Sequence, residues 1–256
     1  HDINYLSIAG VNGHSGRLGE RTPIMGVQIA DLAGGAMHSI IGILAAVNHR
    51  HVTGKGQYID VSMTDGVFAL NSLSGSAYLA GNQLARPESN PLNGGSFYDY
   101  YATSDERYLS IGSLEPKFLS GLSRILKEPQ LERLGFQYKP AQQSELRALL
   151  SSIISEKTFE EWCEIFSGED VCVEPVLNFE EACMHPQLVS RKMVTEIESL
   201  EGHQQNQISS AFRLSASPPQ YAFSGAPLGH HNRQVLEEIG MDDKRITSLL
   251  ESGAFG

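Results

Sequence analysis

The chain has 256 residues, which suits one large domain or two modest domains with a sizeable core. Its formal net charge of -11 argues against a nucleic-acid partner, because no basic patch offsets the negative charge. The composition is ordinary for a soluble globular protein, and no apolar run approaches membrane-spanning length, so we expect no membrane partner.

The pattern of residues 1–63 predicts helices and turns followed by one strand. Residues 1–30 predict a short helix or turn, the loop "NGHSGRLGERTP" and the apolar approach "IMGVQIA". Residues 31–50 are apolar around most of the helix circumference, which predicts a buried helix with Asp31 as its N-cap or in its first turn. Residues 58–63 alternate partially and favour a strand, so this order resembles the tail of an α/β unit.

The remaining elements include those of a second, smaller α/β domain. A small-residue helix around "DGVFALNSLSGSAYLAG" precedes the polar linker "NQLARPESNPLNGG". A hairpin with its turn at residues 104–106 then leads into a helix with Pro116 in its first turn. Helices near 142–156 and 158–167, a strand at "VCVEPVL", a helix at "NFEEACMHP", a polar return segment and two short C-terminal helices follow.

These elements define the predicted domain organisation. It consists of a large-domain portion, a linker helix and loop, the small α/β domain, a return linker, and C-terminal helices that pack on the large domain. The corresponding ranges are 1–63, 64–96, 97–200, 201–226 and 227–256.

Several motifs have simple structural interpretations. "GVNGHSG" lacks the strand and helix of a phosphate-binding loop, and "TGKGQ" is better explained as a turn. Histidine pairs occur at 49/51 and 230/231 without a convincing third ligand, so we expect no metal site. The three cysteines show no metal-type spacing and favour a reduced, intracellular protein; they are Cys163, Cys172 and Cys183.

Three polar residues are unremarkable when taken one at a time. Asp31 could cap its helix, Glu115 could cap the helix that starts at Pro116, and His1 could be a frayed terminus. Their importance depends on whether they belong together.

A family resemblance connects them. The segments "HDINYL", "IADLAGGAMHSIIGILAAVNHRHVTGKGQYIDVSM", "SLEPKF", "EWCEIFSGEDVCVEPVLNFEEA" and "LGHHNRQVLEEIG" together resemble the α-methylacyl-CoA racemases, within the family III CoA-transferase superfamily. The resemblance implies an α/β fold: part of a Rossmann-type large domain plus a smaller α/β domain joined by long linkers. It also implies two interlocked subunits, and a chain that lacks the N-terminal third of a typical member.

The same resemblance implies the site residues. The family motifs place catalytic roles on His1, Asp31 and Glu115. Asp2, Tyr5, Gly34, Gly35 and Met63 are assigned to substrate binding. Val27 stands where racemases of this group often carry Asn, which bears on the substrate.

The implied chemistry is inversion of the carbon next to a thioester. One acid/base group removes a proton from one face and another returns a proton to the other face, and His1 and Asp31 suit these roles. Glu115 would hydrogen-bond His1 and raise its basicity. No cofactor is expected, because CoA is part of the acyl-CoA substrate. The expected partner is a second copy of the chain, in the cytoplasm or an organelle matrix.

Two alternatives stay open at this point. In the CoA-transferases the matching Asp31 would be a nucleophile that accepts the acyl group. A truncated chain that folds or dimerises without catalysing a reaction is the other alternative.

Overall fold

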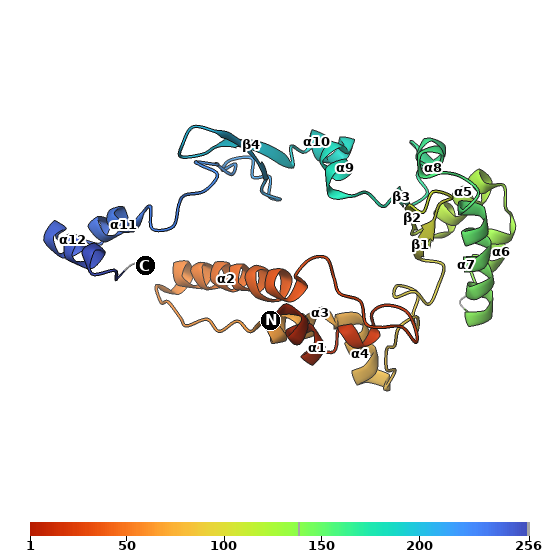
Figure 1. Ribbon diagram of the computed structural model, residues 1–256. Coiled ribbons are helices and arrows are strands. Elements are labelled where there is room, and N and C mark those ends of the chain that lie inside the picture. Colours follow the sequence, from red (N-terminus) through yellow and green to blue (C-terminus); the bar gives the residue numbers. More distant parts are fainter. Residues whose placement is uncertain (138, 255–256) are drawn as a thin grey trace. The chain divides into compact units, whose positions relative to one another are not determined.

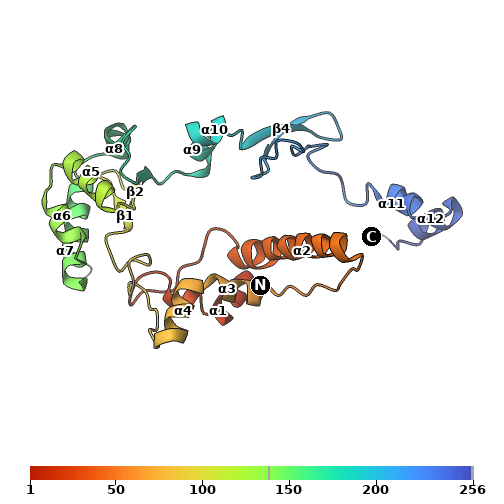
Figure 2. The same cartoon turned by 180° about the vertical axis from the view of Figure 1, so that it is seen from behind.

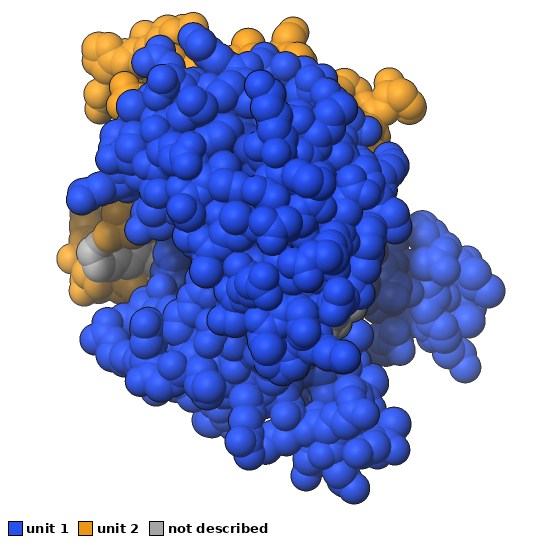
Figure 3. Space-filling model, turned by 90° about the vertical axis from the view of Figure 1, so that its right-hand side faces the viewer, with its two compact units in different colours: residues 1–176 blue, residues 177–256 orange. Residues whose placement is uncertain are grey.

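The computed structural model describes residues 1–137 and 139–254. Its contacts divide the chain into two compact units, His1–Val176 and Leu177–Gly256, which Figure 3 distinguishes by colour. Figure 1 labels the helices and strands. The finer domain organisation predicted from the sequence stays a prediction.

The first part of unit 1 is helical. Its elements are α1 (Asp2–Ile8), the 3-10 helix η1 (Asn12–His14), the π-helix η2 (Ala30–Met37), α2 (His38–Thr53), α3 (Met63–Leu70) and α4 (Ser72–Gly81). Gly54 ends α2 with a φ of 72°, a left-handed conformation that suits glycine. In Figures 1 and 2 α1 lies beside α3. A small core forms where α1, η2 and α3 meet, from Leu6, Ala9, Ala30 and Val67.

The predicted helix at 31–50 is confirmed, with Asp31 in its first turn, but its predicted burial is wrong. None of the residues of α2 is buried, and Ile41 and Leu44 are 62% and 63% exposed. An apolar circumference predicts that something covers a helix, but it does not specify that the cover comes from the same chain.

The expectation about apolar length is also wrong. η2 runs into α2 without a break, and residues 30–53 form a helix of 24 residues that is long and apolar enough to cross a membrane by length and composition. Core helices of soluble proteins share these properties, so the absence of a membrane partner stays a prediction.

The predicted strand at residues 58–63 is wrong. Residues 55–62 have no regular secondary structure, and Met63 begins α3 after the N-cap Ser62. A strand needs a neighbouring strand to complete its hydrogen-bond ladder, and the strands among the described residues pair elsewhere, as β1-β2-β3 and β4-β5.

The small-residue helix is confirmed in two pieces, separated at Asn71. The Asn71 amide nitrogen donates to the Ala9 carbonyl at 2.8 Å, and its amide oxygen lies 3.0 Å from His14 Nε2. Residues 82–95, the predicted polar linker, contain neither helix nor strand.

The rest of unit 1 is an antiparallel sheet packed against helices (Figure 1). Its strands are β1 (Asp99–Ala102), β2 (Tyr108–Ile111) and β3 (Val173–Pro175), and its helices are α5 (Pro116–Leu126), α6 (Gln130–Gly135), α7 (Pro140–Ile154) and α8 (Phe159–Phe166). Tyr101 pairs with Leu109, and Ile111 pairs with Val173. The predicted hairpin, strand and helices are confirmed, whereas the short α6 was not predicted.

Helical spacing explains the core of this region. Leu146, Leu150 and Ile154 recur every four residues along α7 and are fully buried. Burying each such side chain contributes about 1.5–3 kcal/mol. Trp162 lies on the same core, and its indole N–H donates to the Ile154 carbonyl at 2.8 Å.

Unit 2 contains short helices and a hairpin. Its elements are α9 (Phe179–Met184), α10 (Pro186–Ser190), β4 (Val194–Glu198), β5 (Gln204–Ile208), α11 (Asn232–Glu238) and α12 (Asp243–Glu251). The helix predicted at "NFEEACMHP" is confirmed as α9, and it begins with a capping box between Asn178 and Glu181. The β4–β5 hairpin was not predicted, because β5 consists mainly of Gln and Asn and does not alternate.

Candidate active site

The candidate site lies where α1, η2 and α3 meet. The predicted site residues on these elements or at their ends are His1, Asp2, Tyr5, Asp31, Gly34, Gly35 and Met63. Tyr5 packs against the small core formed by Leu6, Ala9, Ala30 and Val67. The structure therefore gathers every predicted site residue except Glu115.

Asp2 joins the starts of two helices. Its Oδ1 accepts hydrogen bonds from the Ala30 N–H at 2.6 Å and from the Asp31 N–H at 3.1 Å. Amides at a helix start have no partner inside the helix and need an external acceptor. Because His1 precedes Asp2, this contact holds the backbone of both predicted acid/base residues at one place.

Asp31 does not cap its own helix. It lies in the first turn of η2 and is exposed, and its carboxylate makes no hydrogen bond to any described residue. The capping interpretation of Asp31 is therefore wrong, since Asp2 supplies the acceptor. A carboxylate in the first turn is favoured by the helix dipole and is free to meet a ligand.

The glycines of η2 allow close contact with α3. A Cβ on Gly34 would lie 2.7 Å from Val67 Cγ2 and 2.8 Å from the Met63 carbonyl oxygen. A Cβ on Gly35 would lie 2.9 Å from Met63 Cγ. Gly66 approaches η2 from α3 in the same way, and the sequence analysis missed it. The glycine-containing start of α3, "MTDG", was the available signal.

The π-helical form of η2 was also not predicted. Single π-helical turns inside α-helices occur frequently at functional sites. His38 Nδ1 lies 2.5 Å from the Ala33 carbonyl oxygen, where a ring N–H at this position donates to it. His38 thus supports the turn that follows Asp31.

Glu115 stands apart from this cluster. It is the N-cap residue of α5 and is exposed, but its side chain makes no capping hydrogen bond. The interpretation of Glu115 as a side-chain helix cap is therefore wrong. Partial burial and the nearby charges of Glu115 and Asp170 raise the pKa of the Cys172 thiol. In the part of the chain that the structure describes, no hydrogen bond or ion pair joins Glu115 to His1 or Asp31.

A cavity of about 550 Å³ opens beside the cluster. It lies between the end of α1, residues 10–14 and helices α3 and α4. Small and apolar residues form most of its wall, including Ala9, Phe68, Ala69, Tyr78, Leu79 and Leu84. The small-residue stretch after Met63 therefore lines a space that an apolar chain could enter, although Met63 is not part of the wall.

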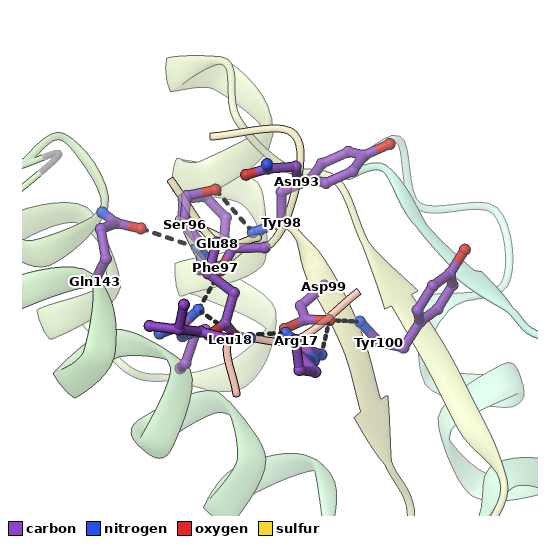
Figure 4. A network of polar contacts seen from close by, with 12 residues as sticks. Arg17, Leu18, Glu88, Asn93, Ser96, Phe97, Tyr98, Asp99, Tyr100 and Gln143 are labelled. Carbon is purple, nitrogen blue, oxygen red and sulfur yellow. Dashed lines mark hydrogen bonds and ion pairs between the residues drawn. The ribbon is translucent and has the colours of Figure 1, made fainter. Parts of the chain in front are cut away.

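A polar network fixes the segment between η1 and η2 (Figure 4). Arg17 Nη2 donates to Asp99 Oδ1 at 2.5 Å, and Arg17 Nη1 donates to Glu88 Oε1 at 3.2 Å. Arg147 approaches the same Glu88 carboxylate at 3.6 Å. The hydrogen bond to Asp99 is the main cause of the raised pKa of Arg17. This network, which the sequence analysis missed, links the segment between η1 and η2 to β1 and α7.

The histidine pairs are not near further metal ligands. Among residues 1–137 and 139–254, no group of three or more His, Cys, Asp or Glu side chains could hold a metal ion. His49 and His51 are exposed, and the rings of His230 and His231 contact each other with their centroids 4.7 Å apart.

The fold and the gathered motifs define a class of proteins. The profile of CoA-transferase family III matches residues 1–232, and the chain belongs to this family. It is 35% identical over 252 residues to the α-methylacyl-CoA racemase of Mus musculus, and 34% identical over 255 residues to that of Homo sapiens. A more distant relative, the succinyl-CoA:glutarate CoA-transferase of Homo sapiens, is 26% identical over 234 residues.

The matches cover most of this chain but only part of the relatives. The racemase alignments include 97% of this chain and 65% and 64% of the mouse and human proteins. A solved CaiB/BaiF family protein from Brucella suis matches with a TM-score of 0.72 and 21% identity, over 93% of this chain and 62% of that chain. The predicted family and α/β fold class are confirmed. The interlocked dimer and the roles of the site residues stay predictions.

Proposed function

We propose that this chain carries the catalytic residues of a racemase that inverts the α-carbon of 2-methylacyl-CoA thioesters. The observation that carries the proposal is the similarity to two racemases across 97% of the chain. The contact of Asp2 with the start of η2 supports it, because that contact keeps His1 and Asp31 in one cluster.

The proposed reaction is a transfer of protons through an enolate. One residue of the pair His1 and Asp31 takes the α-proton, and the electron pair of the broken C–H bond moves onto the thioester oxygen. The other residue then donates its proton to the opposite face as the C=O bond reforms. One of the two groups begins protonated and the other deprotonated, and the reaction exchanges these states, so the same pair serves both directions.

The substrate class follows from the chemistry and the cavity. The acyl chain would lie in the apolar cavity lined by α3 and α4, and CoA would enter as part of the substrate with no separate cofactor. A homodimer is the proposed assembly. Among the described residues of one copy, Glu115 makes no hydrogen bond to His1. In an interlocked dimer, Glu115 of one copy would be free to approach His1 of the other. The proposed location is the cytoplasm or an organelle matrix.

A transferase is the second candidate, and the similarity to a CoA-transferase favours it. In that reaction the Asp31 carboxylate attacks the thioester carbonyl and expels the CoA thiolate, which leaves an acyl–aspartate anhydride.

One experiment separates these functions. The protein is incubated with one enantiomer of a 2-methylacyl-CoA in heavy water, with and without hydroxylamine, and followed by mass spectrometry and chiral chromatography. A racemase incorporates deuterium at the α-carbon, inverts the substrate and gives no hydroxamate at Asp31. Hydroxamate at Asp31 without deuterium at the α-carbon would establish the transferase. A non-catalytic chain would give neither α-deuterium nor a hydroxamate at Asp31.

A further inference from the structure

The carboxylate of Asp2 has an unusual position for a residue at the start of a helix. It lies in the first turn of α1, yet its Oδ1 bonds to the first amides of η2, 28 and 29 residues later along the chain. A single oxygen atom therefore accepts from two consecutive amides of another helix. The side chain is half-buried and does not cap α1 itself.

This contact is more than a local helix cap. One of the two amides belongs to Asp31, and the residue next to Asp2 is His1. The Asp2 side chain thus fixes the start of η2 at the N-terminal end of α1, in addition to the core that Leu6 shares with Ala30. Close packing of Gly34 on α3 holds the other side of η2.

We propose that Asp2 is a positioning residue, whose carboxylate acts as a hydrogen-bond acceptor that sets Asp31 relative to His1. The role rests on the racemase function proposed above. In this proposal Asp2 acts through the helix and not through the substrate contact that the family resemblance implies, so the position of its acceptor oxygen matters more than its charge.

Two conservative variants separate geometry from charge. Asp2→Asn keeps an acceptor oxygen at the same distance along the side chain from the backbone but removes the charge. Asp2→Glu keeps the charge but moves the acceptor by one methylene. A displacement of about 1 Å in a catalytic group lowers the rate by about 100-fold. We therefore expect Asp2→Glu to lower kcat by about 10–100-fold with KM within about threefold, and Asp2→Asn to retain clearly more activity than Asp2→Glu.

The assay follows inversion and α-deuterium exchange in heavy water, at a temperature where circular dichroism shows every variant fully folded. Thr158→Ala is the matched control, because Thr158 caps α8 through its bond from the Glu161 N–H at 3.3 Å, on the other hydrophobic core. This variant is expected to lower thermal stability without changing kcat. Amide hydrogen exchange provides a second measurement: protection at Ala30 and Asp31 should survive in Asp2→Asn and fall in Asp2→Glu.

The outcomes are distinct. The reverse order, with Asp2→Glu active and Asp2→Asn inactive, would overturn positioning in favour of a charge that meets the substrate. Equal kcat in all variants would overturn any role in the reaction. A wild-type protein without exchange or inversion would overturn the racemase function and this role with it, while amide protection would still report whether the contact exists.

Discussion

Gly66 and Gly34 meet backbone to backbone: a Cβ on Gly66 would lie 2.3 Å from the Gly34 carbonyl oxygen and 2.8 Å from the Gly34 Cα. No side chain can be accommodated at such distances without moving the helices. This contact joins η2, which carries Asp31, to α3, which begins with Met63.

Gly66→Ala should therefore separate η2 from α3. We expect a loss of about 1–3 kcal/mol in the free energy of unfolding, which is typical of overpacking. Chemical denaturation followed by circular dichroism measures it. Gly75→Ala is the control, because its Cβ would meet only Asn71 Cβ at 3.5 Å. Alanine is the better helix former, so this control should gain about 0.5–1 kcal/mol. Equal stability of the two variants would contradict the close contact.

Asp31→Asn should abolish inversion and leave the fold intact. The carboxylate is exposed and makes no hydrogen bond in the described part of the chain, so the free energy of unfolding should change by no more than about 0.5 kcal/mol. Chiral analysis of a 2-methylacyl-CoA and thermal unfolding provide the two measurements. Near-normal inversion by a folded variant would refute the role of Asp31 as an acid or base.

Glu115→Gln should slow α-proton exchange by about 10²–10⁴-fold, the range for a positioned acid/base group. Its stability should stay that of wild type, because Glu115 makes no capping hydrogen bond. Deuterium incorporation measures the exchange, and hydroxylamine trapping should stay negative. Unchanged exchange would remove Glu115 from the site.

Arg17→Ala should weaken the link between β1 and the segment that joins η1 to η2. Asp99, whose side chain is only 11% exposed, would lose its guanidinium partner. Arg17 itself is 41% exposed, so solvent screening limits the expected loss to about 1–2 kcal/mol, and less at high salt. Denaturation at low and high salt tests this. The exposed pair Arg124–Glu169, with a separation of 2.9 Å, is the control, and Arg124→Ala should cost less than about 1 kcal/mol.

Asp105 should titrate below the ordinary range of an aspartate. The Thr103 hydroxyl donates to its carboxylate at 2.5 Å and the Phe159 N–H donates at 3.0 Å, and the Thr103 bond is the main cause of the lowered pKa. The resulting stability is present above the unfolded-state pKa and is lost as the pH falls through the folded-state pKa. NMR titration of Asp105 measures the shift. Thr103→Val should raise the pKa of Asp105, and an unchanged value would contradict this assignment.

The sequence by itself determined the elements whose signals are local. The helices predicted at α5, α7 and α9 are confirmed, with Pro116 in the first turn of α5 as predicted. Their signals depend on neighbours along the chain. The motifs around His1 and Asp31 also identified the family and nominated the residues that α1, η2 and α3 bring together.

Only the tertiary structure decided the contacts between distant segments. Whether residues 58–63 form a strand depends on a partner strand, and whether α2 is buried depends on a covering surface; neither is encoded in the local pattern. The same holds for the Gly34–Gly66 contact, and for Asp2, whose carboxylate caps η2 and leaves that of Asp31 without a hydrogen bond to any described residue. A hydrogen bond or a close packing contact forms between atoms within a few ångströms, and chain folding alone sets which distant residues come that near.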